Sequence, residues 1–293
     1  MHPILFHLPG GHPIWSYGVM LGLSCVLGGH LAVYLCERSG ISRTQAWKMT
    51  IFVIVVGLVG GRVHDLIINR QPLEEWLKFE HAGRTAYGAF ISGIAAAIAG
   101  GYLFKMSFWR FGDAAAPTMA LGLGLTRIGC FLYGCDYGFQ SDAWGMCFPR
   151  GSPAWIDQEA AGKIAFTAEQ SLPVFPTQLP SSLVGFTIFT ILMLAWFRRP
   201  RREGSVLLLF LLTYGIGRAG LEALRADEGR GSLLGLSTST TIGLTTAALA
   251  AVFLFVPQLA KLRGDAGPVL DVPDDDRAGD GKSGKPSQPK KSS

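Results

Sequence analysis

The chain has 293 residues, of which 49% are hydrophobic and only 16% are charged, and its formal net charge is +5. Soluble domains carry about 25% charged residues. The composition therefore excludes an ordinary soluble domain and indicates an integral membrane protein.

The hydrophobic residues gather in long blocks, and a helix that crosses a bilayer needs roughly 20 mostly apolar residues. Seven blocks follow one another at about 14–35, 49–68, 86–106, 114–133, 180–197, 205–224 and 236–257. The residues before the first block contain neither a basic segment nor a small-residue cleavage site, so we expect no removable signal peptide. We predict an all-α integral membrane protein with about seven transmembrane helices.

Lysine and arginine predict the orientation of these helices, because cytoplasmic loops are enriched in basic residues. One set of connections is dense in basic side chains, notably Arg198, Arg199, Arg201 and Arg202. The other set is poorer in them for its length and comprises the N-terminus, 69–85, 134–179 and 225–235. We therefore expect the N-terminus outside and the C-terminus in the cytoplasm. Topology and anionic lipid then account for the net charge, and no stretch resembles a nucleic-acid-binding module.

Composition also predicts the domain organisation. Residues 1–262 are expected to form one polytopic membrane domain with an external segment at 134–179. Residues 263–293 are rich in Asp, Lys, Gly, Pro and Ser. Such a segment cannot bury a core, and we expect it to be a disordered cytoplasmic tail.

The five cysteines fall into two groups. Cys25 and Cys36 belong to the first block or its end, where a buried thiol behaves as a small hydrophobe. Cys130, Cys135 and Cys147 lie at or beyond the outer end of the fourth block, where an oxidising compartment allows a disulfide among them. Because no histidine is near them in the sequence, their spacing is not typical of a metal site.

Ionisable residues inside spans are costly and mark functional positions. Arg62 and Asp65 stand in the second block, either as a structural i,i+3 pair or as part of a site. Asp113 opens the fourth block and Arg127 ends it.

The sixth block contains the stretch TYGIGRAGLEALR, which places Tyr214, Arg218, Glu222 and Arg225 on one helix face. Arginine binds phosphate with two parallel hydrogen bonds and keeps its proton. We therefore predict a cationic pocket for a phospholipid head group near the outer leaflet, with Glu222 fixing Arg218. Two alternatives stay open, a purely structural Arg218–Glu222 pair and an Arg225 that only reaches to the membrane interface.

An ordered series of motifs carries a family resemblance: SYGVMLG, VGGRVHDLI, YGAFISG, TRIGCFLYGCDYG, WGMCFP, FPTQLPSS and LLTYGIGRAGLEALR. Over roughly 14–257 the chain resembles the prolipoprotein diacylglyceryl transferases. The resemblance implies a seven-span inner-membrane enzyme with an external active site and with no metal or organic cofactor. Its expected substrates are phosphatidylglycerol and the signal peptide of a preprolipoprotein, whose lipobox cysteine thiol receives the diacylglyceryl group while glycerol phosphate leaves.

The resemblance also implies roles for particular residues. Arg127 and Arg218 match the arginines that hold the lipid phosphate. Functional positions of the family are further matched by Tyr17, Gly138, Tyr214, Glu222 and Arg225.

This chain departs from the common family motifs at several positions. Tyr87 stands where the family typically has a histidine proposed as a base, and Phe175 replaces the histidine of a later motif. Cys130 and Cys135 stand where an asparagine and a glutamate are usual, a pattern similar to that of a divergent branch. We place Tyr87 among the catalytic candidates and Cys130 among the substrate-binding candidates.

Three interpretations follow from these residues. The first is an active transferase, and the second is a catalytically impaired paralogue that binds phospholipid or preprolipoprotein. The third is a variant that uses Cys130 and Cys135 as a redox pair or as a transient acyl-carrying nucleophile. A transporter is disfavoured, because the spans show neither a clear internal repeat nor a pair of broken helices.

Overall fold

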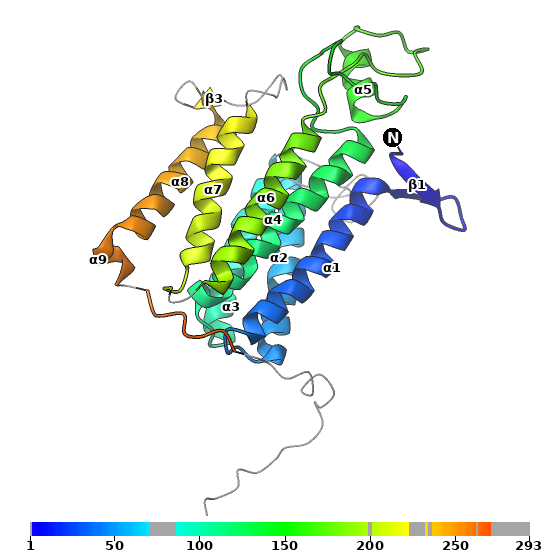
Figure 1. The fold of residues 1–293 in the computed structure, drawn as a ribbon. Helices are drawn as coiled ribbons and strands as arrows, with labels where there is room; N and C mark the ends of the chain where they lie inside the picture. Colours follow the sequence, from blue (N-terminus) through cyan, green and yellow to red (C-terminus); the bar gives the residue numbers. More distant parts are fainter. Residues whose placement is uncertain are drawn as a thin grey trace, which may run out of the picture.

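A computed structural model describes residues 2–68, 70, 86–198, 201–222, 232–233, 236–261 and 263–270. Seven long helices in these ranges form an up-and-down bundle (Figure 1): α1 (Ser16–Glu37), α2 (Arg43–Ile68), α3 (Ala86–Leu103), α4 (Phe108–Tyr133), α6 (Gln178–Phe197), α7 (Ser205–Glu222) and α8 (Thr238–Phe255). The short elements are α5 (Pro153–Ala160), α9 (Pro257–Ala260) and two antiparallel ribbons, β1 (Ile4–His7) with β2 (Pro13–Trp15) and β3 (Ser232–Leu233) with β4 (Leu236–Ser237).

The long helices match the seven hydrophobic blocks, and the expected all-α membrane architecture is confirmed. Five helices are long and apolar enough to cross a membrane: α1, α2, α4, α6 and α7. The apolar parts of α3 and α8 are shorter, at Gly88–Leu103 and Ser239–Phe255.

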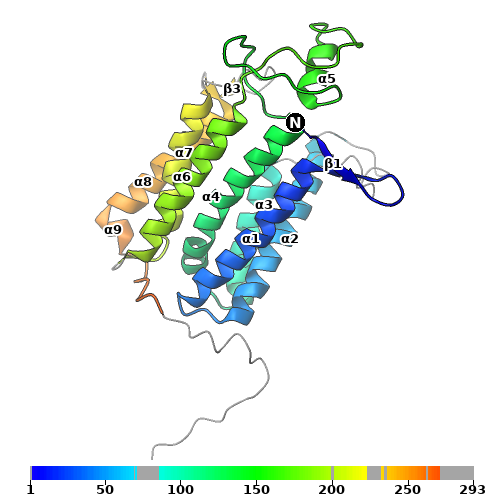
Figure 2. The same cartoon turned by 45° about the vertical axis from the view of Figure 1, so that its right-hand side comes forward.

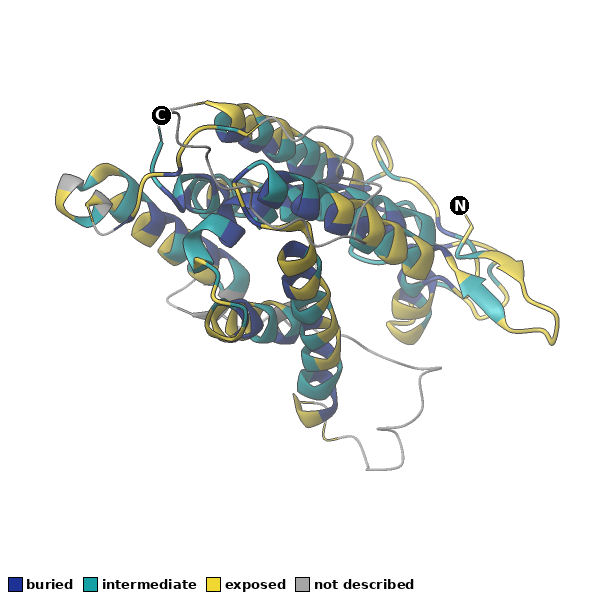
Figure 3. Ribbon diagram, turned by 90° about the horizontal axis from the view of Figure 1, so that it is seen from below, coloured by how far each residue is buried: buried dark blue, intermediate teal, exposed yellow. Residues whose placement is uncertain are grey.

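Large apolar side chains cover the outside of the bundle. More than half of the side-chain surface is exposed at Val26, Val59, Ile91, Leu183, Ile216 and Leu249. Seen from below, each long helix carries exposed positions as well as buried ones (Figure 3). So large an apolar surface would drive association in water, whereas lipid tails cover it in a bilayer.

Helix α4 is the centre of the bundle, because it packs against α1, α6 and α7. Helices α2 and α3 pair with each other, as do α7 and α8 (Figures 1 and 2). Glycines let α6 approach α4 closely and let α7 approach α8 closely, as is usual between membrane helices. A Cβ added at Gly185 of α6 would lie 2.9 Å from the Cα of Gly124 in α4, and one added at Gly215 of α7 would lie 2.8 Å from the Cβ of Ala247 in α8.

A buried carboxylate fixes the start of α7 on α4. Asp113 is 2% exposed, and its side chain forms an ion pair with Arg201. One carboxylate oxygen accepts hydrogen bonds from the backbone N–H groups of Val206 and Leu207, at 2.8 and 3.0 Å, and the other accepts from that of Gly204 at 3.0 Å. The first N–H groups of a helix have no partner within the helix and carry partial positive charge. Asp113 therefore caps α7 from a neighbouring helix, a role that its place at the start of the fourth block did not reveal.

A second polar cluster lies at the same end of the bundle, around Glu203. Its carboxylate accepts from Ser107 Oγ at 2.6 Å and from Arg110 Nε and Nη2 at 2.9 and 2.6 Å. Arg263 is 4% exposed and donates to the backbone oxygens of Glu203 and Phe253 and to Ser205 Oγ. The sequence placed the start of a disordered tail at Arg263. That boundary is too early, because 263–270 lie within the described structure and Arg263 packs into the bundle. Residues 271–293 lie outside the described residues.

The segment 134–179, expected to be external, has a small core of its own at the opposite end of the bundle. Phe148, Ala154 and Val174 are buried together, with Tyr137 packed against them. Backbone bridges join Gln140 and Met146 to Val174. The segment carries α5 and lies above the ends of α4 and α6 (Figures 1 and 2).

The Asp113 network yields a prediction on stability. Substitution Asp113→Asn keeps the shape of the side chain but leaves the Arg201 guanidinium buried without its counter-charge. Breaking a buried ion pair in this way costs about 3–5 kcal/mol. We expect a loss of that size in the free energy of unfolding, measured by denaturant titration in detergent micelles. Asp142→Asn, at an exposed position of the external segment, is the control, and equal stability of the two variants would refute the role given to Asp113.

Candidate functional site

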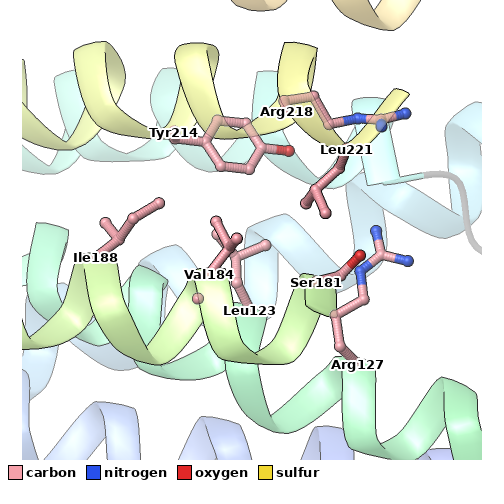
Figure 4. A pocket seen from close by; sticks show the side chains of 9 residues that line it. Leu123, Arg127, Ser181, Val184, Ile188, Tyr214, Arg218 and Leu221 are labelled. Carbon is pink, nitrogen blue, oxygen red and sulfur yellow. The ribbon is translucent and has the colours of Figure 1, made fainter. Parts of the chain in front are cut away.

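A pocket opens between α4, α6 and α7, at the end of the bundle below the external segment. The pocket is small and partly open, and the free space in and around it amounts to about 420 Å³ when the adjoining solvent is included. Its lining residues are Leu123 and Arg127 from α4, Ser181, Val184, Gly185 and Ile188 from α6, and Tyr214, Arg218 and Leu221 from α7. The two guanidinium groups lie at the same end of the pocket, on opposite walls, and mainly apolar side chains line the rest (Figure 4).

Arg127 stands two turns before the end of α4. It forms an ion pair with Asp136, with Nη1 and Oδ2 2.5 Å apart. Asp136 follows Gly134, the left-handed residue that ends α4, and itself has a φ of 57°. A hydrogen bond of 2.5 Å from Thr177 Oγ1 to the backbone oxygen of Asp136 holds this turn against the start of α6. The loop after α4 thus brings a carboxylate back onto the arginine.

Arg218 stands on the last turns of α7 and pairs with Glu222 one turn later, with Nη1 and Oε2 2.9 Å apart. Tyr214, one turn earlier on the same face, stacks its ring on Phe210 at a centroid distance of 5.6 Å. The expected common face of Tyr214, Arg218 and Glu222 is present, and the first two of these residues line the pocket. Arg225 lies outside the described residues.

Each pocket arginine therefore has a carboxylate beside it. A guanidinium carries five N–H donors, so one carboxylate does not use them all. The carboxylates hold the two arginines in place and offset their positive charge. Because of this compensation, two guanidinium groups can lie near one another in an apolar bundle. An anion with several acceptor oxygens can bind between them.

The remaining candidates lie around this pocket rather than in its lining. Tyr17, in the first turn of α1, lies against Gly129 of α4, and its hydroxyl is within electrostatic range of Arg127 and Asp136. Gly138 donates its backbone N–H to the oxygen of Phe175 at 2.9 Å, inside the external segment. Tyr87 lies in the first turn of α3, and its side chain is outside the described part of the chain.

On α2, Arg62 and Asp65 form the i,i+3 pair that their spacing suggested, with Nη1 and Oδ2 3.7 Å apart. Their side chains are largely buried, at 14% and 12% exposure. Neither residue is part of the pocket lining.

The cysteines are free thiols, so the disulfide that the sequence allowed is not formed. Cys147 is exposed, whereas Cys130 is buried and donates its S–H to Asp136 Oδ2 at 3.4 Å. The sulfur atoms of Cys130 and Cys135 and a carboxylate oxygen of Asp136 lie within 4.8 Å of one another. The sequence spacing alone did not suggest this cluster.

Two site residues were missed from the sequence. Asp136 stands inside the stretch TRIGCFLYGCDYG, and its carboxylate forms an ion pair with Arg127. Ser181, within the motif FPTQLPSS, received no role from the sequence, yet it lines the pocket, and its hydroxyl donates to the backbone oxygen of Thr177 at 2.6 Å. The signal for Asp136 was its position two residues after Gly134, the glycine that ends α4.

Comparison with known proteins supplies a family. A model described as prolipoprotein diacylglyceryl transferase matches residues 3–256. A phosphatidylglycerol–prolipoprotein diacylglyceryl transferase of Clostridium tetani is 32% identical over 264 residues, covering 87% of this chain and 97% of that protein. The Clostridium perfringens protein named phosphatidylglycerol–prolipoprotein diacylglyceryl transferase 2 is 30% identical over 80% of this chain and 87% of its own.

A third relative, the phosphatidylglycerol–prolipoprotein diacylglyceryl transferase of Acaryochloris marina, is 26% identical over 77% of this chain and 80% of its own. The matched region includes every helix that lines the pocket. The chain therefore belongs to the prolipoprotein diacylglyceryl transferase family.

Proposed function

We propose that this protein transfers a diacylglyceryl group from phosphatidylglycerol to the lipobox cysteine thiol in the signal peptide of preprolipoproteins and releases glycerol phosphate. The observation that carries the proposal is the pocket with Arg127 and Arg218 at one end and an apolar lining beyond them. The two arginines suit the phosphate of a phospholipid, and the apolar lining suits the acyl chains attached to its glycerol.

The two arginines fit the demands of the reaction. The thiolate sulfur attacks the glycerol carbon next to the phosphate, a C–S bond forms, and the C–O bond breaks. The bonding electron pair goes to the phosphate oxygen, so the leaving glycerol phosphate gains one negative charge. Fixed cations stabilise such a charge without reorganising. The ion pairs of Arg127 with Asp136 and of Arg218 with Glu222 support this role, because they hold the guanidinium groups in place.

Other residues receive roles around this centre. Tyr214 lines the pocket one turn from Arg218 and is suited to donate to a head-group oxygen. Tyr17 lies by Arg127 and Cys130 at the end of α4. Tyr87, Gly138 and Arg225 remain candidates from the family motifs.

The proposed location is the bacterial inner membrane, with the pocket on the outer side. The connections at the other end of the bundle carry Arg38, Lys105, Arg198, Arg201, Arg202 and Arg263. This excess of basic residues favours a cytoplasmic position for that end. The N-terminus and the segment 134–179 are then external, where that segment lies close to the pocket and can meet the preprolipoprotein.

A second function is favoured by two departures from the family motifs. Tyr87 and Phe175 stand at two positions where the family motifs have histidines, and a tyrosine has an unperturbed pKa of about 10. A protein without a base at these positions could bind phospholipid or preprolipoprotein and not turn it over.

Lipid binding provides the first test. Arg127→Lys and Arg218→Lys keep the positive charge but remove the planar pair of N–H donors that fits a phosphate. We expect each substitution to weaken phosphatidylglycerol binding by roughly tenfold or more, which corresponds to about 1.4 kcal/mol. Native mass spectrometry of the detergent-solubilised protein measures the affinity.

The matched control for lipid binding is Arg43→Lys. Arg43 lies at the opposite end of the bundle, is about half exposed, and makes a long contact of 3.9 Å with Glu37. Affinities of Arg127→Lys and Arg218→Lys equal to that of the control, in folded protein, would place the phosphate elsewhere.

Turnover provides the second test. Purified protein is mixed with phosphatidylglycerol and a lipobox peptide, and glycerol phosphate and the lipid-modified peptide are quantified. We expect both products from the wild type and a loss of about a hundredfold or more in Arg218→Ala, the cost of removing one donor to a developing anion. Arg43→Ala should retain the wild-type rate. Phosphatidylglycerol binding by the wild type without either product would favour the lipid-binding paralogue.

A further inference from the structure

Two thiols and a carboxylate converge at the outer end of α4. Cys130 occupies the last turn of the helix, and Cys135 and Asp136 follow the glycine that ends it. The two Sγ atoms and a carboxylate oxygen lie within 4.8 Å of one another, and Cys130 Sγ lies 3.4 Å from Asp136 Oδ2.

The backbone holds this cluster together from two sides. The N–H groups of Gly134 and Cys135 both donate to the oxygen of Cys130, at 2.8 and 3.1 Å, so the chain folds back on its own helix. Gln178 Nε2 donates to the oxygen of Cys135 at 2.7 Å from the first turn of α6. Asp136 adopts the left-handed conformation that a residue with a side chain rarely takes. The convergence of the three side chains is thus imposed by the fold.

The distance between Cys130 and Asp136 matches that between two ligands of a tetrahedral zinc site. Zinc–sulfur bonds of about 2.3 Å and zinc–oxygen bonds of about 2.0–2.2 Å at a tetrahedral angle put sulfur and oxygen about 3.6 Å apart. The observed 3.4 Å between Cys130 Sγ and Asp136 Oδ2 agrees closely. A zinc ion would take the place of the proton that these two atoms share.

The charges also fit a divalent cation. Two thiolates, one carboxylate and one Zn²⁺ sum to −1, and the guanidinium of Arg127, paired with Asp136, balances that charge. Cys130 is 5% exposed. A bare thiolate there would be costly, whereas coordination of a metal compensates it.

We propose that Cys130, Cys135 and Asp136 bind a zinc ion whose fourth position accepts the thiol of the protein substrate. The metal site stands on the cluster alone, while the choice of ligand for its fourth position rests on the proposed function. Catalytic zinc sites have three protein ligands and an open position of this kind. A thiol that coordinates zinc is deprotonated outright.

This arrangement supplies a thiolate where the family histidines are replaced by Tyr87 and Phe175. The substrate thiol loses its proton to solvent when its sulfur binds the metal. The sulfur then attacks the glycerol carbon of phosphatidylglycerol, the C–O bond breaks, and glycerol phosphate leaves with the electron pair. Arg127 links the two sites, because it lines the lipid pocket and pairs with the carboxylate of the metal site.

Metal binding by the purified full chain tests the site directly. After removal of metal with a chelator, the protein is titrated with Zn²⁺ and with Co²⁺, whose bonds to thiolates give strong near-ultraviolet absorption. We expect one ion per chain and a thiolate-to-cobalt band. Cys130→Ser and Cys135→Ser should each abolish the band and weaken Zn²⁺ binding by more than the roughly 10- to 100-fold that loss of an outer-shell partner costs.

The matched control is Cys147→Ser, which removes an exposed thiol of the same external segment and should bind both metals as the wild type does. Failure of the reduced wild type to bind either ion would overturn the proposal. A Cys130–Cys135 disulfide in the freshly purified protein, or metal binding that survives Cys130→Ser and Cys135→Ser, would overturn it equally.

Activity separates this proposal from the proposed function. Arg218→Ala should bind metal normally and lose turnover, whereas Cys135→Ser should lose both. Metal binding in a wild type that releases no glycerol phosphate would support the metal site and refute the transferase. Full turnover by chelator-treated protein shown to be free of metal would refute the role of the ion in thiol activation.

Discussion

The carboxylate of Asp113 is the contact on which the geometry of the pocket depends. It joins α4 to the first turn of α7 through three backbone N–H groups and the guanidinium of Arg201. Arg127 follows Asp113 by 14 residues, and Arg218 follows Val206 by 12. At a rise of about 1.5 Å per residue these stretches span about 21 and about 18 Å. Fixing the start of α7 on α4 therefore brings both arginines to the same level, at the far end of two adjacent helices.

Close glycine contacts set the helix pairs around the pocket. Gly185 draws α6 onto α4, and Gly215 draws α7 onto α8. Between these two pairs, a Cβ added at Gly217 of α7 would lie 3.0 Å from Val184 Cγ1 of α6, and larger side chains, among them Leu123, Val184 and Tyr214, line the pocket. In the proposed function, the phosphate of the lipid lies at the level of Arg127 and Arg218, beside the apolar side chains of the pocket.

Much of this architecture was predictable from the sequence. The hydrophobic blocks located the seven long helices, and the four-residue spacing of Tyr214, Arg218 and Glu222 predicted their shared face, because both signals are local. The partners of Arg127 and Asp113 were not predictable. Asp136 reaches Arg127 only because a left-handed turn reverses the chain, and Asp113 caps a helix that begins 92 residues later in the sequence. Arg263 was assigned to the tail by composition, yet its guanidinium is buried against Glu203 and Phe253. Contacts between distant segments decided each of these cases.

The central claim is that Arg127 and Arg218 together bind the phosphate of the lipid substrate. A cryo-electron microscopy map of the protein in lipid nanodiscs containing phosphatidylglycerol tests it most directly. The account predicts density for a phosphate between the two guanidinium groups, with the acyl chains running along Val184 and Ile188 toward the bilayer. A bound phosphatidylglycerol whose phosphate contacts neither arginine would contradict it.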